Sequence, residues 1–272
     1  MIAIVSDSSI SLTQKEAAEL GIHIVPMTYT VAGRPFHEHY SDTNGAFERL
    51  VSHYPCTTSQ PASAAFMSTF QELVRQGYEV LCLVISSRLS GTYSSATIAA
   101  KEISAEKIRI VDTRTTVGGM RFLAERAKEL IAQDAKGLEE VALALERERE
   151  KVSILFSVEN MAPLRRSGRL GFVRQSISTI LNIRPILMCR DGTLVSHGFA
   201  KGKRQQIEKI VETVPAAVKK ITVLYLGDIK EARDLAAAVT KKFPDLVPSV
   251  TAVGPVLGIH LGIPAVGVAW TL

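Results

Sequence analysis

Hydroxyl side chains gather in short polar segments that follow apolar stretches of the sequence. The richest are Asp7-Ser8-Ser9, Thr57-Thr58-Ser59 and the stretch from Ser86 to Thr92. In an open parallel sheet, the loops at the carboxyl ends of the strands meet in one crevice, where ligands usually bind. Helix amides favour an anion there, and hydroxyl groups add neutral donors without a competing cation. The pattern therefore predicts a site for a carboxylate or a phosphate.

Each of these hydroxyl groups, taken alone, is more often a helix cap than a ligand-binding group. Their recurrence in several loops favours a site. Ser90 as a nucleophile has little support, because the segment 88–92 does not form a G-x-S-x-G elbow and no His–acid pair is indicated. The sequence also contains no G-x-G-x-x-G fingerprint after Val5 and no P-loop.

The first half of the chain alternates short apolar runs with amphipathic stretches, as in a parallel sheet covered by helices. Pro61 suits the first position of a further helix, with Ser59 or Gln60 as its cap. We expect strands over residues 1–5, 80–85 and 108–111, and helices over residues 13–20, from residue 92, and around residues 122–130.

The second half follows a charged helix that we expect over residues 137–151. Asp191-Gly192 lies between two apolar runs and predicts a tight antiparallel hairpin. A mixed or antiparallel sheet follows from this pattern. We expect strands over residues 152–158, 184–189, 193–199, 221–226 and 266–270, and helices over residues 205–214 and 231–243. The predicted domains are residues 1–150 and 151–272.

Composition narrows the class of protein. A chain of 272 residues with 46% hydrophobic and 22% charged residues is typical of globular domains, and no apolar run is long enough to insert stably into a membrane. The net charge of +5 is spread among acidic residues, which argues against nucleic-acid binding. Three scattered cysteines and an apolar start without a signal-peptide pattern favour the cytoplasm and give no metal site.

His260 lies in a segment with glycine at positions 254, 258 and 262, which permits close approach of the backbone. A single histidine in an apolar segment is more often a core or turn residue than a ligand. No acidic residue or cysteine stands at metal-ligand spacing from it. We therefore predict no metal for this segment.

An ordered series of motifs resembles the DegV family of bacterial fatty-acid-binding proteins over essentially the whole chain. The series departs from the family pattern at Thr113, Ser167, Ile263-Pro264 and residues 199–203. The motifs that carry the resemblance are Ile4-Val5-Ser6-Asp7-Ser8, Thr58-Ser59-Gln60-Pro61, the segment from Ser87 to Ala96, Asp112 with Gly119, the segment from Leu164 to Leu170, Arg184-Pro185-Ile186-Leu187 and the region of His260.

The resemblance implies an α/β fold with an N-terminal three-layer α/β/α domain and a C-terminal two-layer domain, with an acyl chain held between or within them. It also implies a lipid-carrying subunit of a fatty-acid kinase, without a cofactor of its own, whose separate catalytic subunit supplies ATP and metal. In that scheme the chain itself is not an enzyme.

The resemblance also implies roles for particular residues. Thr58 and Ser90 match hydroxyls that hold the fatty-acid carboxylate, and His260 and Arg169 match residues near the exposed head of the ligand. We assign the carboxylate site to Thr58, Ser59, Ser90, Gly91 and His260, and the surface that faces the partner or a phosphate to Arg166 and Arg169. A stand-alone α/β enzyme and a small-anion or phosphate-binding module that use the same loops remain as alternatives.

Overall fold

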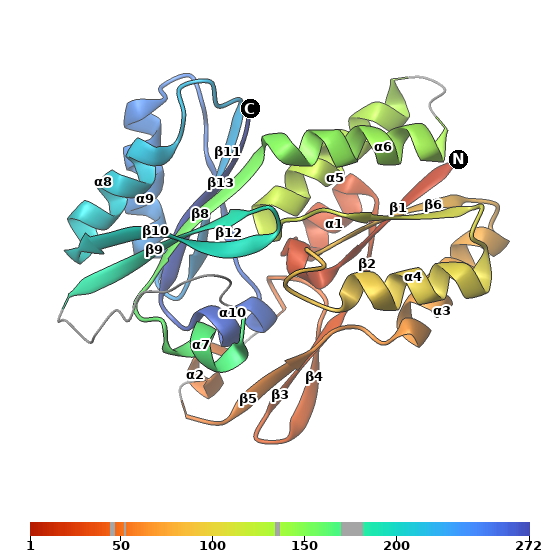
Figure 1. Ribbon diagram of the computed structural model, residues 1–272, viewed down its shortest axis with the longest axis horizontal. Helices are drawn as coiled ribbons and strands as arrows, with labels where there is room; N and C mark the ends of the chain where they lie inside the picture. Colours follow the sequence, from red (N-terminus) through yellow and green to blue (C-terminus); the bar gives the residue numbers. More distant parts are fainter. Residues whose placement is uncertain (44–46, 52, 134–136, 170–181) are drawn as a thin grey trace.

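A four-stranded parallel sheet forms the centre of the first half of the chain (Figure 1). The computed structural model describes residues 1–43, 47–51, 53–133, 137–169 and 182–272. The strand order is β2–β1–β6–β7, in which neighbouring strands are all parallel. The bounds are β1 (Ile2–Asp7), β2 (Ile22–Val25), β6 (Glu79–Val84) and β7 (Ile108–Asp112).

Helices cover both faces of this sheet. Successive residues of a strand point to opposite faces, and here the residues on both faces are apolar. Leu81 and Leu83 belong to one core cluster, and Val80, Cys82 and Val84 belong to another. The first cluster includes residues of α1 (Gln14–Leu20), α5 (Val117–Ala132) and α6 (Leu138–Glu148), and the second includes residues of α3 (Ser63–Arg75) and α4 (Thr92–Ile103). The short 3-10 helices are η1 (Ser8–Ile10) and η2 (Arg149–Lys151).

A six-stranded mixed sheet forms the second half, in the order β10–β9–β8–β13–β11–β12. Only β11 and β12 are parallel neighbours. The predicted hairpin is confirmed, with Asp191 and Gly192 both at positive φ between its strands. The bounds are β8 (Val152–Val158), β9 (Ile183–Arg190), β10 (Thr193–Lys201), β11 (Lys220–Leu226), β12 (Ser249–Ala252) and β13 (Ala265–Thr271).

The two faces of the mixed sheet have different neighbours. Helices α8 (Gly202–Thr213) and α9 (Ile229–Lys242) contribute to the core on one face. The opposite face packs with the start of α5 and with residues of α7 (Ala162–Ser167) and α10 (Pro255–Leu261). The predicted α/β class, with a parallel sheet and a mixed sheet, is confirmed. The boundary after residue 150 stays a prediction.

A third sheet, which the sequence analysis did not predict, has the antiparallel order β4–β3–β5. Figure 1 shows it projecting from the body of the molecule, beside α2 and α10. Its apolar side includes Tyr29, whose ring stacks on Phe36 and meets Phe47 edge-on. The bounds are β3 (Met27–Val31), β4 (Arg34–Glu38), β5 (Cys56–Ser59) and α2 (Phe47–Val51).

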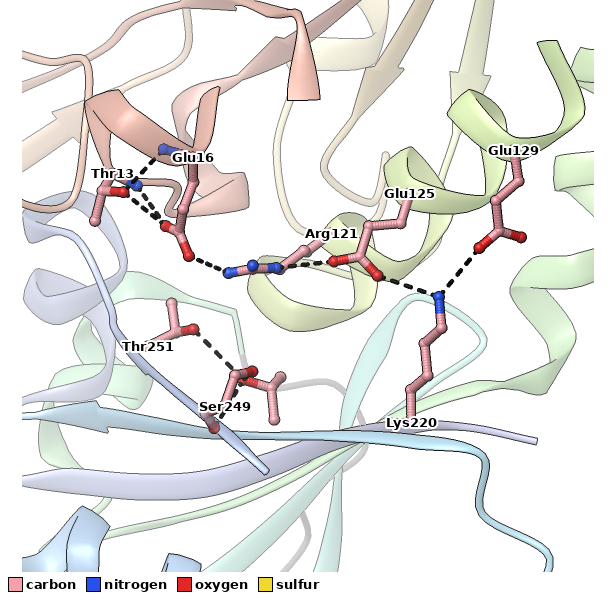
Figure 2. A network of polar contacts seen from close by, with 9 residues as sticks. Thr13, Glu16, Arg121, Glu125, Glu129, Lys220, Ser249 and Thr251 are labelled. Carbon is pink, nitrogen blue, oxygen red and sulfur yellow. Dashed lines mark hydrogen bonds and ion pairs between the residues drawn. The ribbon is translucent and has the colours of Figure 1, made fainter. Parts of the chain in front are cut away.

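A chain of ion pairs joins the two halves through α5 (Figure 2). Arg121 contacts Glu16 of α1 at 2.5 Å and Glu125 at 3.1 Å. Lys220 of β11 contacts Glu125 at 3.4 Å and Glu129 at 3.2 Å. Such pairs gain from forming a network, although each exposed pair alone contributes little. The network holds α5 between the parallel sheet and the mixed sheet.

Gly118 allows α5 to lie directly on the mixed sheet. A Cβ atom at this position would lie 2.5 Å from Thr222 Cγ2 and 2.8 Å from Ala269 Cβ. Any larger side chain would separate the helix from β11 and β13. The close packing brings the first residues of α5 against the inner face of the mixed sheet.

Candidate functional site

An apolar cavity lies where the mixed sheet, the start of α5 and α10 meet. Its aliphatic and aromatic walls come mainly from the second half of the chain. Leu89 and Ile85 contribute from the first half, just after β6. The main wall residues are Val117, Ile154, Phe156, Leu164, Leu194, Leu224, Leu226, Val253, Val256, Leu257 and Leu261. A cavity with such walls suits an apolar ligand, since burial of apolar surface supplies the affinity.

Polar side chains line the same cavity at the third sheet and at the loop after β6. Thr58 and Ser90 are half-buried, and Ser59 and Gln60 are exposed. Arg169 is exposed as well, and among the described lining residues it alone carries a charge at neutral pH. The cavity therefore combines apolar walls with a polar rim that contains one cation.

The Thr58 hydroxyl and the His260 imidazole form the central contact of this rim. Thr58 Oγ1 lies 2.8 Å from His260 Nε2, and the direction of the hydrogen bond depends on the tautomer. Burial, and then the positive charge of Arg169, lower the pKa of His260 to about 4. The ring is therefore neutral at pH 7, and one of its two nitrogen atoms carries the proton.

The two tautomers leave different groups for a ligand. When Nε2 carries the proton, His260 donates to Thr58 Oγ1, and the hydroxyl hydrogen of Thr58 is free for another acceptor. When Nδ1 carries it, Thr58 donates to His260 instead. His260 Nδ1 is buried and has no hydrogen-bond partner among the described residues.

Ser90 and Gly91 lie at the start of α4. Ser90 Oγ lies 2.8 Å from Thr92 Oγ1, and Gly91 is the N-cap residue of the helix. A Cβ atom on Gly91 would lie 2.5–2.8 Å from the side-chain amide of Gln60. Gly91 therefore allows Gln60 to approach α4, although Gly91 itself does not line the cavity.

The two arginines assigned to the partner surface differ in position. Arg169 lines the cavity, and its guanidinium group donates to the carbonyl oxygens of Ser167 and Leu89, the latter at 3.5 Å. Arg166 is exposed on α7 and is not a lining residue. The structure thus brings Thr58, Ser59, Ser90, His260 and Arg169 to one cavity, and leaves Gly91 and Arg166 outside its lining.

Comparison with known proteins identifies the family. A family model described as an uncharacterised protein of the DegV family matches residues 1–272. The chain belongs to the DegV family. A DegV domain-containing protein of Clostridium acetobutylicum is 31% identical, with coverage of 99% of this chain and 97% of the relative. Protein DegV of Bacillus subtilis is 26% identical over 99% of this chain and 98% of its own length.

Solved structures of DegV-family proteins share the fold. A DegV-family protein of Thermus thermophilus, described for its fatty-acid binding, has a TM-score of 0.86 and 31% identity, with coverage of 100% of this chain and 99% of that one. DegV of Bacillus subtilis, described as a fatty-acid-binding protein, has a TM-score of 0.85 and 25% identity, with the same coverage.

Two of the three hydroxyl-rich segments of this DegV-family chain serve mainly to hold the fold together. Asp7 is fully buried and accepts hydrogen bonds from the Ser9 amide, the Ser9 hydroxyl and the Ile85 amide. Ser86 donates to the carbonyl of Gly192, and Ser87 donates to Asp112. Within the lining, the segment around residues 86–92 contributes Leu89 and Ser90.

Two local predictions around the site were wrong. Residues 57–59 belong to strand β5 of the third sheet, not to a loop that begins a helix. Helix α3 begins at Ser63 after Ala62, and neither Ser59 nor Gln60 caps it. The segment around His260 forms helix α10. Gly258 of this helix leaves space for the Phe47 ring, which would lie 2.9 Å from a Cβ atom at that position.

Sequence reasoning did not identify Gln60 or the apolar walls as parts of the site. Gln60 stands next to the predicted hydroxyls, and its amide is a further possible donor. Among the residues that the structure describes, no group of three or more His, Cys, Asp or Glu side chains is arranged to hold a metal ion. Within the same residues, no helix is long and apolar enough to cross a bilayer.

Proposed function

We propose that the chain binds one long-chain fatty acid, with the acyl chain in the apolar cavity and the carboxylate at the polar rim. The observation that carries this proposal is that the apolar walls and the side chains of Thr58, Ser90, His260 and Arg169 line the same cavity. The fatty-acid binding described for the proteins of Thermus thermophilus and Bacillus subtilis supports it.

The apolar walls would supply the affinity, and the polar rim would orient the ligand. An acyl chain with roughly 14 methylene groups, at about 0.8 kcal/mol each, could contribute on the order of 10 kcal/mol before ordering costs. The carboxylate would accept hydrogen bonds from the hydroxyls of Thr58 and Ser90 and would be attracted by the positive charge of Arg169. For Thr58 this requires the tautomer in which His260 Nε2 donates to Thr58 Oγ1.

We further propose that the chain presents this carboxylate to a separate kinase subunit and is not itself an enzyme. A carboxylate oxygen would attack the terminal phosphorus of ATP, the bond from that phosphorus to the bridging oxygen would break, and ADP would leave. The products are an acyl phosphate and ADP. The partner would supply ATP and metal, and the exposed Arg166 and Arg169 are the residues we assign to its side of the complex.

A hydrolase is the main enzymatic alternative, with His260 as its base. The hydroxyl in contact with His260 belongs to Thr58, whereas the Ser90 hydroxyl contacts Thr92. A catalytic triad also requires an acid that orients the imidazole through its other nitrogen. In the described part of the chain, His260 Nδ1 has no such partner, which favours the binding function.

Mass spectrometry of the organic extract from purified protein tests the proposal. We expect about one fatty acid per chain in protein prepared without added lipid, because an apolar cavity would recruit one from the expression host. Extracts without fatty acid from several preparations would count against lipid binding. Turnover of esters without a partner would favour the hydrolase, and a small anion in place of lipid would favour an anion-binding module.

A further inference from the structure

Glu38 is a buried carboxyl group that the proposed function does not use. Its residue surface is 1% exposed, although the four preceding residues of β4 are all exposed. Glu38 is not among the residues that line the cavity. Burial of a carboxyl group is unfavourable unless hydrogen bonds compensate for the lost water. Its partners therefore indicate what holds it there.

The partners of Glu38 lie on α10 and at the start of η1, just after β1. The backbone amide of Val256 donates to Glu38 Oε2 at 2.6 Å, and the side chain of Ser8 forms a second hydrogen bond with the carboxyl group. Gly254 provides the space for this contact, since a Cβ atom there would lie 2.6–2.7 Å from the carboxyl atoms. Any residue can adopt the φ of −75° found at Gly254. Glycine is therefore required by the lack of room for a side chain and not by the backbone conformation.

The third sheet holds α10 at both ends of the helix. In β3, Met27 pairs with Glu38 of β4, and Tyr29 pairs with Thr58 of β5. Glu38 bonds to Val256 near the start of α10, and Thr58 contacts His260 near its end. The first contact uses the backbone amide of Val256, which points along the helix axis, and the second uses the side chain of His260. The two contacts thus fix the first and the last turn of α10 to one sheet.

We propose that Glu38 is a positioning residue: by holding the first turn of α10 against β4, it keeps the His260 imidazole in contact with Thr58. The identity of the ligand rests on the proposed function, but the effect on His260 is a property of the ligand-free chain. Without Glu38, the Val256 amide loses its buried acceptor, and the first turn of α10 is held against the third sheet by apolar packing without this hydrogen bond.

The contact does not depend on the charge of Glu38. Burial and, to a smaller degree, the nearby charge of Asp7 raise the pKa of Glu38 to about 7, against the opposing effect of the hydrogen bonds from Val256 and Ser8. Tyr29 lies on the same face of β3 as Met27, the partner of Glu38, and burial followed by the charge of Glu38 raises the pKa of Tyr29. Because a protonated carboxyl or an amide still has an acceptor oxygen, Glu38→Gln can keep the bond to Val256.

Nuclear magnetic resonance of His260 in the delipidated full chain tests this role. We expect the wild type and Glu38→Gln to show His260 with a pKa near 4 and one tautomer. In Glu38→Ala we expect the pKa of His260 to rise by about one unit or more towards its ordinary value as water reaches the ring. Affinity for oleic acid should fall about ten-fold in Glu38→Ala and stay within about three-fold in Glu38→Gln.

Val31→Ala is the matched control, because it removes buried methyl groups from β3 and leaves the hydrogen bonds of Glu38 and Thr58 to α10 in place. It should lower the stability of the chain and leave the pKa of His260 unchanged. A wild-type pKa and tautomer of His260 in Glu38→Ala would overturn the proposal. An equal shift in Val31→Ala would also overturn it, since general damage to the sheet would then explain the result.

Gly254→Ala provides the test should Glu38→Ala fail to fold. The added methyl group displaces the carboxyl group while the backbone stays in an allowed conformation, so the same shift of His260 is expected, and an unchanged His260 overturns the proposal. If the wild type itself fails to bind oleic acid, the proposed function fails. The spectra of His260 still decide the role of Glu38 in that case.

Discussion

The Thr58 hydroxyl and the His260 imidazole lie 2.8 Å apart, although 202 positions separate them in the sequence. The contact joins β5 of the third sheet to α10, so it forms only when both elements are in place. His260 is neutral at pH 7, and in its Nε2–H tautomer it donates to Thr58 and leaves the hydroxyl hydrogen for a ligand. Protonation of the ring therefore has consequences for stability that can be measured.

We predict that His260 makes the chain less stable as the pH falls from 6.5 to about 4. Its pKa is about 4 in the folded chain and near 6.5 when unfolded, so in this range the unfolded state binds the proton more readily. The loss approaches about 1.4 kcal/mol per pH unit at most. Urea titrations at several pH values should show the free energy of unfolding of the wild type falling relative to His260→Gln. A constant difference would contradict the assignment.

Glu38 should have the opposite dependence. Its pKa of about 7 in the folded chain lies above the ordinary value of 4.5, so the folded state binds this proton more tightly. The resulting stability is present below pH 4.5 and is lost as the pH rises to about 7. Relative to Glu38→Gln, the wild type should therefore lose free energy of unfolding over this range. The same titrations measure it, and a difference that stays constant or rises over this range would contradict the raised pKa.

The sequence predicts β1, β6 and β7 of the parallel sheet because their signals are local, whereas the edge strand β2 was not predicted. The apolar run of β6 is buried on both faces, and Gly21 ends α1 at a positive φ, as expected for a helix terminus. The third sheet was missed because β5 is four residues long and rich in hydroxyls. β-branched threonine suits a strand as well as a loop, so sequence alone did not separate the two.

The candidate site was predicted in part, from the motifs of the family resemblance. Thr58, Ser90 and His260 all line the cavity, and their role in binding a carboxylate stays a prediction. The hydroxyls of Ser8 and Ser9 instead bond within the fold, since nothing in a short polar segment specifies which way each side chain faces. The apolar walls were not predicted, because an apolar residue that lines a cavity has the same sequence pattern as one in a filled core.

Arg166 and Arg169 should respond differently to charge reversal. Arg169→Glu places a negative charge at the cavity beside the proposed carboxylate, and we expect affinity for oleic acid to fall about ten-fold through like-charge repulsion. Arg166→Glu lies outside the lining and should keep affinity within about two-fold. Both should lower acyl-phosphate formation with a partner kinase. Equal loss of lipid in both variants would place Arg166 at the cavity as well.

Gly267→Ala should destabilise the chain strongly. Gly267 lines the cavity on β13, and a Cβ atom there would lie 2.5 Å from the carbonyl oxygen of Leu155 and from Phe156 Cβ. Both neighbours belong to the adjacent strand β8, so neither can move easily, and we expect a loss of about 3 kcal/mol or more. Gly137→Ala is the control, because no atom of the described residues lies within 4 Å of its Cβ position. Gly137→Ala should lower the free energy of unfolding by less than about 1 kcal/mol. Similar thermal melts for both variants would contradict this packing.

Thr58 and Ser90 provide the sharpest test of the carboxylate site. A hydrogen bond to a charged group contributes roughly 1.5–3 kcal/mol, so Thr58→Val and Ser90→Ala should each weaken binding of oleic acid about ten-fold to a hundred-fold. Thr58→Ser keeps the hydroxyl and should stay close to the wild type. The chain should still fold, because valine suits strand β5 and the lost hydrogen bonds of Thr58 or Ser90 cost only about 1 kcal/mol each.

The methyl ester of oleic acid separates the carboxylate contact from the apolar contacts. It fills the same cavity but carries no negative charge, so it should bind the wild type poorly and be much less sensitive to either substitution. Titration of acid and ester, with thermal melts of each variant, provides the measurement. If Thr58→Val and Ser90→Ala both hold the acid as tightly as the wild type, these hydroxyls serve only the fold, and the carboxylate lies elsewhere along the cavity.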